Sequence, residues 1–158
     1  MTGDIQARAR WFSAEMLVAA RFAAQGYVVG TPLTLCGYDL LVDTGQAIWR
    51  VQVKHAGFKE ARMRPKGRGA SARYAVGLLR HRAAGKSFLA CHEFDLLCAV
   101  CAADRIYVIP VGCLVSRTDA SRLVGHLEFK VGDSFRKDHS AARTRWEPYL
   151  NAFTLSEV

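Results

Sequence analysis

A turn-forming cluster between two strand-forming runs constrains the fold of this chain more than any other part of its sequence. The cluster is Asp43-Thr44-Gly45, and the runs around it, 38–42 and 47–53, are rich in β-branched, aromatic and other apolar residues. Turn residues placed between two such runs predict a β-hairpin. The first third of the chain is therefore expected to contain two short strands joined by a tight turn.

The second strand of this hairpin has one apolar and one largely polar face. Alternate side chains of a strand point to opposite sides. One face is expected to hold Ile48, Arg50, Gln52 and Lys54, and the other Trp49, Val51 and Val53. With the chain reversing at Thr44-Gly45, Asp39 should lie roughly opposite Arg50 and diagonal to Gln52. A carboxylate, an amide oxygen and an ammonium group are thus expected to converge on one small patch.

The residues of this patch resemble the motif of the PD-(D/E)xK endonuclease superfamily. Gly37-Tyr38-Asp39 is followed, after the turn, by Val51-Gln52-Val53-Lys54. Asp39 matches the acid of the motif, Gln52 stands in the (D/E) place, and Lys54 matches the lysine. The glutamine form is similar to the group with a Q-x-K motif, which includes intron-encoded homing endonucleases.

The resemblance covers residues 4–111 and implies a fold. It implies an α/β, restriction-endonuclease-like three-layer fold, with a central mixed β-sheet flanked by helices. At 158 residues and 51% hydrophobic residues, the chain is expected to close one core. We expect a single domain, with its nuclease-like core at about 4–111 and a C-terminal extension at 112–158.

A first helix is predicted over residues 4–25, ending at Gly26. An apolar stripe of this helix includes Val18 and Phe22, and Glu15 occupies a position of that stripe where another apolar residue would be expected. Because burial of an unpaired carboxylate is costly, Glu15 either reaches the helix edge or pairs with an arginine, or it faces the metal site, as the resemblance implies. Asp95 likewise either matches an acid of the family or only pairs with a basic neighbour.

The other predicted elements are mostly strands. Strands are expected at 27–29, 71–79, 93–100, 105–111 and 127–131. Short helices are expected at 116–126 and 145–153, the second interrupted at Pro148.

The net charge of +8 comes from one segment. Nine of the 22 lysines and arginines lie between Lys59 and Lys86 with Glu60 as their only acid, and the rest of the chain is neutral. Residues 59–69 contain Pro65 and two glycines without helical or strand periodicity, which predicts a loop. Lys and Arg neutralise phosphate, so this loop is expected to hold a nucleic-acid backbone. The candidate DNA-binding residues are Arg50, His55, Lys59, Arg62, Arg64, Lys66, Arg68 and Arg73.

Two of these candidates have alternative interpretations. Arg50 either screens Asp39 or contacts DNA, and the position of His55 fits a phosphate contact, a structural role or a solvated side chain.

The activity implied by the resemblance is metal-dependent cleavage of phosphodiester bonds. A hard divalent cation neutralises phosphate and makes water nucleophilic, and Mg²⁺ prefers oxygen ligands. We expect Asp39 as a direct ligand, completed by the Val53 carbonyl, Gln52 and Glu15, with Mn²⁺ able to substitute. Lys54 would orient or deprotonate the attacking water, or stabilise charge on the phosphate. The neutral Gln52 predicts weaker metal binding than a carboxylate would give.

Other classes of protein and of site are disfavoured. The longest apolar run, Leu96–Ala103, is far shorter than the roughly 18 residues of a membrane span, and charges interrupt the start of the chain where a signal peptide would be apolar. We therefore expect a cytoplasmic protein. Five cysteines predict free thiols. Zinc is not expected, because Cys98 and Cys101 are three apart in an apparent strand and would face opposite ways.

The leading hypothesis is a Mg²⁺-dependent endodeoxyribonuclease of the homing, restriction or junction-resolving type. Cutting both strands of DNA would require two sites, hence a homodimer or higher homo-oligomer. The alternative is a catalytically inactive nucleic-acid-binding module of the same fold, with Gln52 as the sign of lost activity. A third possibility is an interaction protein with a basic loop.

Overall fold

The computed structural model describes residues 2–60, 72–82, 85–131 and 145–155. The elements, in chain order, are α1 (Thr2–Ala23), β1 (Val28–Gly30), β2 (Leu40–Asp43), β3 (Ile48–His55), β4 (Gly57–Lys59), β5 (Arg73–Gly77), β6 (Leu79–Arg82), β7 (Gly85–Phe88), β8 (Leu96–Ala102), β9 (Arg105–Pro110), η1 (Val111–Leu114), β10 (His126–Lys130) and η3 (Glu147–Tyr149).

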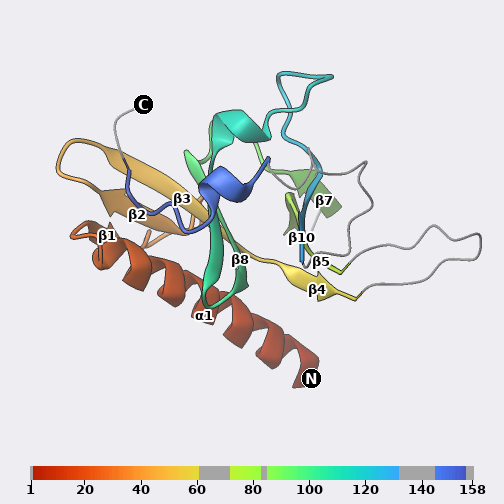
Figure 1. Ribbon diagram of the computed structural model, residues 1–158, viewed down its shortest axis with the longest axis horizontal. Helices are drawn as coiled ribbons and strands as arrows, with labels where there is room; N and C mark the ends of the chain where they lie inside the picture. Colours follow the sequence, from red (N-terminus) through yellow and green to blue (C-terminus); the bar gives the residue numbers. More distant parts are fainter. Residues whose placement is uncertain (1, 61–71, 83–84, 132–144, 156–158) are drawn as a thin grey trace, which may run out of the picture.

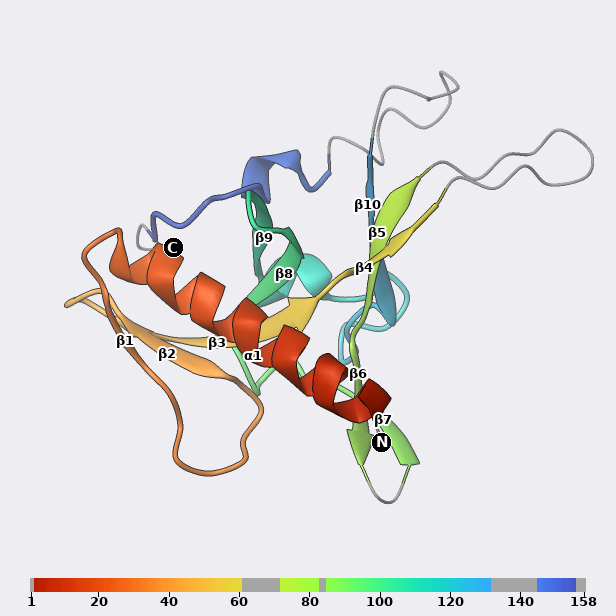
Figure 2. The same cartoon turned by 90° about the horizontal axis from the view of Figure 1, so that it is seen from below.

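Five strands form a central mixed sheet in the order β1-β2-β3-β8-β9. β3 and β8 are parallel, and the other neighbours in this sheet are antiparallel. Helix α1 crosses one face of the sheet (Figures 1 and 2). Its apolar stripe, which includes Val18 and Phe22, packs with inward residues of the sheet such as Val51 and Val53. The predicted mixed α/β class is confirmed.

The opposite face of the central sheet carries a second core. It is covered by a three-stranded sheet in the order β10-β5-β4 and by the turns η1 and η3. Both views show β4, β5 and β10 standing together beside the central sheet, away from β1 and β2 (Figures 1 and 2). Phe129 of β10 stacks on Tyr107 of β9 with ring centroids 4.2 Å apart, which joins the two sheets.

The first helix is confirmed, but α1 begins at Thr2 and ends at Ala23, two residues before each predicted bound, and Gly26 lies in the turn that follows it. The Gly26 N–H donates to the Ala23 carbonyl at 2.9 Å, and Gly26 has φ +86°, a conformation that glycine adopts without cost. The last described segment returns to this end of the helix: the Phe153 ring packs edge-on against Phe22 at 5.0 Å, and the Leu155 N–H donates to the Tyr27 hydroxyl at 3.0 Å.

The central hairpin is confirmed, but its register differs by two residues from the prediction. Leu41 pairs with Arg50, so Asp39 is in register with Gln52 and not with Arg50. The cause is the turn: the Thr44 hydroxyl accepts the Ala47 N–H at 3.1 Å, which moves the reversal to the far side of Gly45. The shift keeps the same side chains on the polar face. It brings Asp39 closer to Gln52 than predicted.

Two predicted helices in the C-terminal part are wrong. Residues 116–126 form bends and a bridge between Val115 and Leu123, because Asp119 accepts both the N–H and the hydroxyl of Ser121, bonds that compete with helix formation. Residues 145–153 contain only the short 3₁₀ turn η3, which has Pro148 in its first turn. The strand predicted at 127–131 is present as β10.

The state of the cysteines agrees with the sequence analysis. All five cysteines are free thiols. Cys98 and Cys101 point into different cores on opposite faces of β8, and burial raises the pKa of both thiols, that of Cys101 to about 12. Within the described part of the chain, no helix has the length and apolarity required to cross a bilayer.

Candidate active site

The predicted site lies at the point where strand β3 loses one of its two neighbours. β2 pairs with β3 only from Ile48 to Val51, whereas β8 pairs with it from Val51 to His55. In the described structure, the edge of β3 beyond Val51 therefore has no strand partner on the β2 side; we call this the open edge. Both the N–H and the C=O of Val53 point to it, since those of Val51 and Val53 face the β2 side.

Asp39 occupies the place that the next residue of β2 would take. Its N–H donates to the Val51 carbonyl at 2.8 Å, which completes the ladder. Its side chain then turns along the open edge, where Oδ2 accepts the Val53 N–H at 2.7 Å. A carboxylate that accepts a backbone N–H is held in one orientation, so Asp39 is fixed on β3 by its main chain and its side chain together.

Gln52 is the one buried polar side chain of the described residues, with 5% of its surface exposed. Its Nε2 donates to Asp39 Oδ2 and, at 3.2 Å, to the Val53 carbonyl oxygen. The amide N–H group therefore bridges two oxygens that face the open edge. Without such partners a buried amide would destabilise the fold, so Gln52 and Asp39 support each other.

Glu15 reaches the same region from helix α1. It is half-buried, and burial and the nearby Asp39 carboxylate raise its pKa, while the Lys54 ammonium group opposes the shift. The side chain thus lies within electrostatic reach of both groups. Two carboxylates and an ammonium group, from α1, the residue before β2, and β3, therefore interact electrostatically. This region is the candidate active site.

Arg50, on the same face of β3 as Gln52, is bound to Asp95. Its guanidinium donates from Nη2 to Asp95 Oδ1 at 2.7 Å and from Nε to Oδ2 at 3.0 Å, and its Nη1 donates to the His92 carbonyl at 2.7 Å. The guanidinium lowers the pKa of Asp95. Of the two interpretations given for Asp95, its contacts fit pairing with a basic neighbour. Sequence reasoning missed the His92 carbonyl, which no side-chain pattern could indicate.

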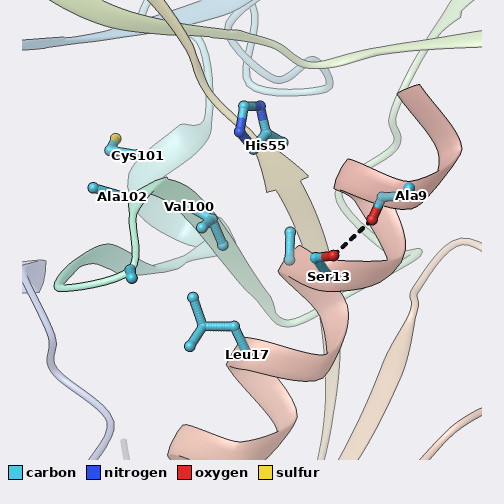
Figure 3. A pocket seen from close by; sticks show the side chains of 9 residues that line it. Ala9, Ser13, Leu17, His55, Val100, Cys101 and Ala102 are labelled. Atoms are coloured by element: carbon cyan, nitrogen blue, oxygen red, sulfur yellow. Dashed lines mark hydrogen bonds between the residues drawn. The ribbon is translucent and has the colours of Figure 1, made fainter. Parts of the chain in front are cut away.

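The structure describes three of the remaining DNA-binding candidates: His55 at the end of β3, Lys59 on β4 and Arg73 on β5. His55 is exposed and lines a shallow, mostly apolar groove of about 300 Å³ between α1 and β8, with Ser13 and Cys101 beside it (Figure 3). Lys59 and Arg73 are paired residues of β4 and β5. The other candidates in the basic loop lie outside the described residues: Arg62, Arg64, Lys66 and Arg68.

The side chains of the described residues form no cluster of three or more metal ligands. Within residues 2–60, 72–82, 85–131 and 145–155, no three His, Cys, Asp or Glu side chains gather as a metal cluster. The candidate active site differs in kind, because its donors are two carboxylates, a backbone carbonyl and an amide.

Comparisons with known proteins identify the family and the fold. The family model described as PD-(D/E)XK endonuclease matches residues 12–126, which include Glu15, Asp39, Gln52 and Lys54. Among solved structures, the bacterial homing endonuclease I-Ssp6803I superposes with a TM-score of 0.68 and 20% identity, over 92% of this chain and 89% of the other. No curated protein matches the sequence. The predicted restriction-endonuclease-like fold is confirmed.

Proposed function

Since this chain belongs to the PD-(D/E)XK endonuclease family, we propose that it is a divalent-metal-dependent endodeoxyribonuclease whose catalytic centre is the open edge of β3. The observations that support the proposal are the Asp39 carboxylate held on this edge by the Val53 N–H and the electrostatic interaction of Glu15 with Asp39 and Lys54. Carboxylates and a carbonyl oxygen are ligands of the kind that Mg²⁺ prefers. Burial and the Asp39 charge raise the pKa of Glu15, and a bound cation would favour its charged form against both.

Each residue has a role in this proposal. Asp39, Glu15, the Val53 carbonyl and the Oε1 of Gln52 would hold Mg²⁺ or Mn²⁺, which when bound supplies charge neutralisation at the phosphate and an acidified water. Lys54 extends from the same strand and would orient the attacking water or stabilise negative charge on the phosphate. A hydrogen-bonded Asp39 changes orientation little when it binds a ligand, which lowers the entropy cost of assembling the site.

The proposal also concerns the number of subunits and the type of nuclease. Cutting both strands of a duplex requires two such sites, so we propose a homodimer or higher homo-oligomer. The solved relative is a homing endonuclease; homing, restriction and junction-resolving activities use the same phosphodiester chemistry. A cytoplasmic location remains a prediction of the sequence.

The proposal is tested by cleavage assays with purified full-length protein. The substrates are supercoiled plasmid, a four-way branched DNA and high-complexity genomic DNA, each in Mg²⁺, Mn²⁺ or EDTA. Asp39→Asn and Lys54→Met should each reduce metal-dependent cutting by roughly a hundredfold or more. The matched control is Asp104→Asn, which changes an exposed acid in the turn between β8 and β9.

Two results would contradict the proposal in different ways. If Asp39→Asn cuts as fast as wild type and Asp104→Asn, the site has been assigned to the wrong residues. If wild type binds DNA but cuts none of the three substrates, the inactive binding module replaces the nuclease as the better explanation.

A further inference from the structure

Gly37, two residues before Asp39, packs very closely against Glu93. A Cβ atom added to Gly37 would lie 2.4 Å from the Glu93 Cβ, 3.0 Å from its Cγ and 3.1 Å from its Cδ. The backbone of Gly37 does not itself require glycine, because its φ is not positive. Non-bonded carbon atoms prefer a separation of about 3.5 Å or more, so any side chain at position 37 would force one of the two segments to move by about 1 Å.

Glu93 belongs to a short turn, residues 90–95, that leads into β8 and is closed on itself. The Glu93 N–H donates to the Ala90 carbonyl at 3.1 Å, and Glu93 Oε2 accepts the Ala90 N–H at 2.8 Å. Phe94, the next residue, is fully buried in the second core. Glu93 is therefore held by its backbone, by its carboxylate and by its neighbour, and its Cβ presents a fixed surface to Gly37.

The turn 90–95 is also bound to β3, the strand that borders the open edge. The Arg50 guanidinium donates to the His92 carbonyl and to both carboxylate oxygens of Asp95. Two further bonds use the Arg50 backbone: its N–H donates to Asp95 Oδ2 at 2.8 Å, and its carbonyl accepts the Asp95 N–H at 2.8 Å. Because these bonds join the turn to β3, a segment that rests on the turn keeps a fixed position relative to β3.

The chain that leads to Asp39 is exposed until it reaches this contact. Residues 33–36 are all exposed, whereas Gly37 and Asp39 are half-buried. Only two planar peptide units separate Gly37 from Asp39, so a displacement of about 1 Å at Gly37 should reach the Asp39 carboxylate with little loss. At a catalytic centre, a misplacement of about 1 Å can cost about a hundredfold in rate.

We propose that Glu93 is a positioning residue for Asp39. By packing against Gly37, it sets where the Asp39 carboxylate lies on the open edge. Arg50 and Asp95 take part by holding the turn 90–95 against β3. This inference rests on the proposed function for what Asp39 does in the reaction, but its first test requires neither metal nor cleavage.

The test variants first fill the contact and then remove the opposing side chain. Gly37→Ala should displace Asp39. Gly37→Ala/Glu93→Gly should restore its position, because Glu93→Gly removes all three atoms that the new Cβ would meet. Gly30→Ala is the matched control and should have no effect, since nothing lies within 4 Å of a Cβ added to this exposed strand glycine.

Hydrogen exchange of the metal-free full chain reports the position of Asp39. The Val53 N–H donates to Asp39 Oδ2 on the open edge, so it should exchange about tenfold faster in Gly37→Ala than in wild type. The Ala56 N–H, which donates to the Val100 carbonyl, is the internal reference for the stability of the same sheet. Displacement of Asp39 accelerates only the first amide, whereas a general loss of stability accelerates both.

Magnesium titration and plasmid cleavage measure the consequence for the proposed reaction. Gly37→Ala should bind Mg²⁺ about tenfold more weakly in calorimetric titrations and cut about a hundredfold more slowly in saturating Mg²⁺, and the double variant should recover both. Glu93→Gln keeps the packing atoms and an oxygen for the Ala90 N–H, so it should cut like wild type. If Glu93→Gln abolishes cutting, Glu93 acts through its charge and the positioning role is wrong.

The outcomes distinguish this inference from the proposed function. If Gly37→Ala leaves the exchange of Val53 unchanged or accelerates Val53 and Ala56 equally, or if the double variant does not recover, the positioning role is wrong even if the protein cuts DNA. If the exchange results are as expected but wild type neither binds Mg²⁺ nor cuts, the positioning of Asp39 stands and the nuclease proposal falls.

A second variant decides the case in which Gly37→Ala does not fold. Glu93→Gly removes the contact from the other side, so it should accelerate the exchange of Val53 relative to Ala56. An unchanged ratio of the two exchange rates would overturn the inference.

Discussion

Replacing Gln52 with glutamate tests whether this residue holds the metal-free site together. Gln52→Glu keeps the size of the side chain but removes the N–H group that donates to Asp39 and to the Val53 carbonyl. It also places a carboxylate beside Asp39 at a position that is 5% exposed. Loss of a hydrogen bond to a charged partner and burial of an unpaired charge together predict a fall of about 3 kcal/mol in the free energy of unfolding in EDTA at pH 8.

The loss of stability caused by Gln52→Glu should grow as pH rises and become smaller when Mg²⁺ binds. Burial and Asp39 raise the pKa of the new carboxyl in the folded state, so the deficit is small below the unfolded pKa of about 4.3 and grows as pH rises. A third carboxylate should in turn tighten Mg²⁺ binding. If the affinity rises tenfold, saturating Mg²⁺ stabilises the variant by about 1.4 kcal/mol more than it stabilises wild type.

Urea unfolding at several pH values, in EDTA and in Mg²⁺, measures both effects. Gln46→Glu is the matched control, because it makes the same chemical change at an exposed position in the hairpin turn. It should change stability by less than about 0.5 kcal/mol. The reasoning fails if Gln52→Glu and Gln46→Glu have the same free energy of unfolding in EDTA. It also fails if Mg²⁺ does not reduce the difference in free energy of unfolding between Gln52→Glu and wild type.

Two further predictions concern carboxylates with shifted pKa values. Glu15→Gln should stabilise the metal-free protein at pH 7 and remove its stabilisation by Mg²⁺: burial and Asp39 raise the pKa of Glu15, so its charged form destabilises the fold increasingly as pH rises above the unfolded pKa of about 4.3. Thermal melts that show this variant less stable than wild type at pH 7 would contradict this. Asp95→Asn should destabilise the protein by about 1–2 kcal/mol at neutral pH, because it weakens a partly exposed pair with Arg50. Arg50 lowers the pKa of Asp95, so this stabilisation is present above the unfolded pKa of about 3.9 and lost as pH falls through the folded pKa; urea midpoints that still differ at pH 2 would speak against it.

The hairpin and its polar face could be predicted because they depend on local pattern. Strand alternation alone places Gln52 and Lys54 on one face, and a turn of either length leaves Asp39 on that face. The pattern could not predict the register in which β2 pairs with β3. That depends on the Thr44 hydroxyl, which binds the Ala47 N–H and lengthens the turn.

The parts that escaped prediction depend on contacts between distant segments or on side chains that bind their own backbone. Lys130 lies beside Arg73 only through the pairing of β10 with β5, more than 50 residues away in sequence. No local periodicity indicates such a pairing. The helix predicted around Asp119 failed because short polar side chains there bind nearby N–H groups instead.

The junction of β3 and β4 fixes how the central sheet and the three-stranded sheet are joined. Ala56, the residue between the two strands, is 1% exposed, and its N–H donates to the Val100 carbonyl at 2.9 Å. A stretch of chain that is buried and hydrogen-bonded at this point is held against sliding along β8. The spacing between the candidate active site on β3 and the start of β4 is therefore set by the covalent chain.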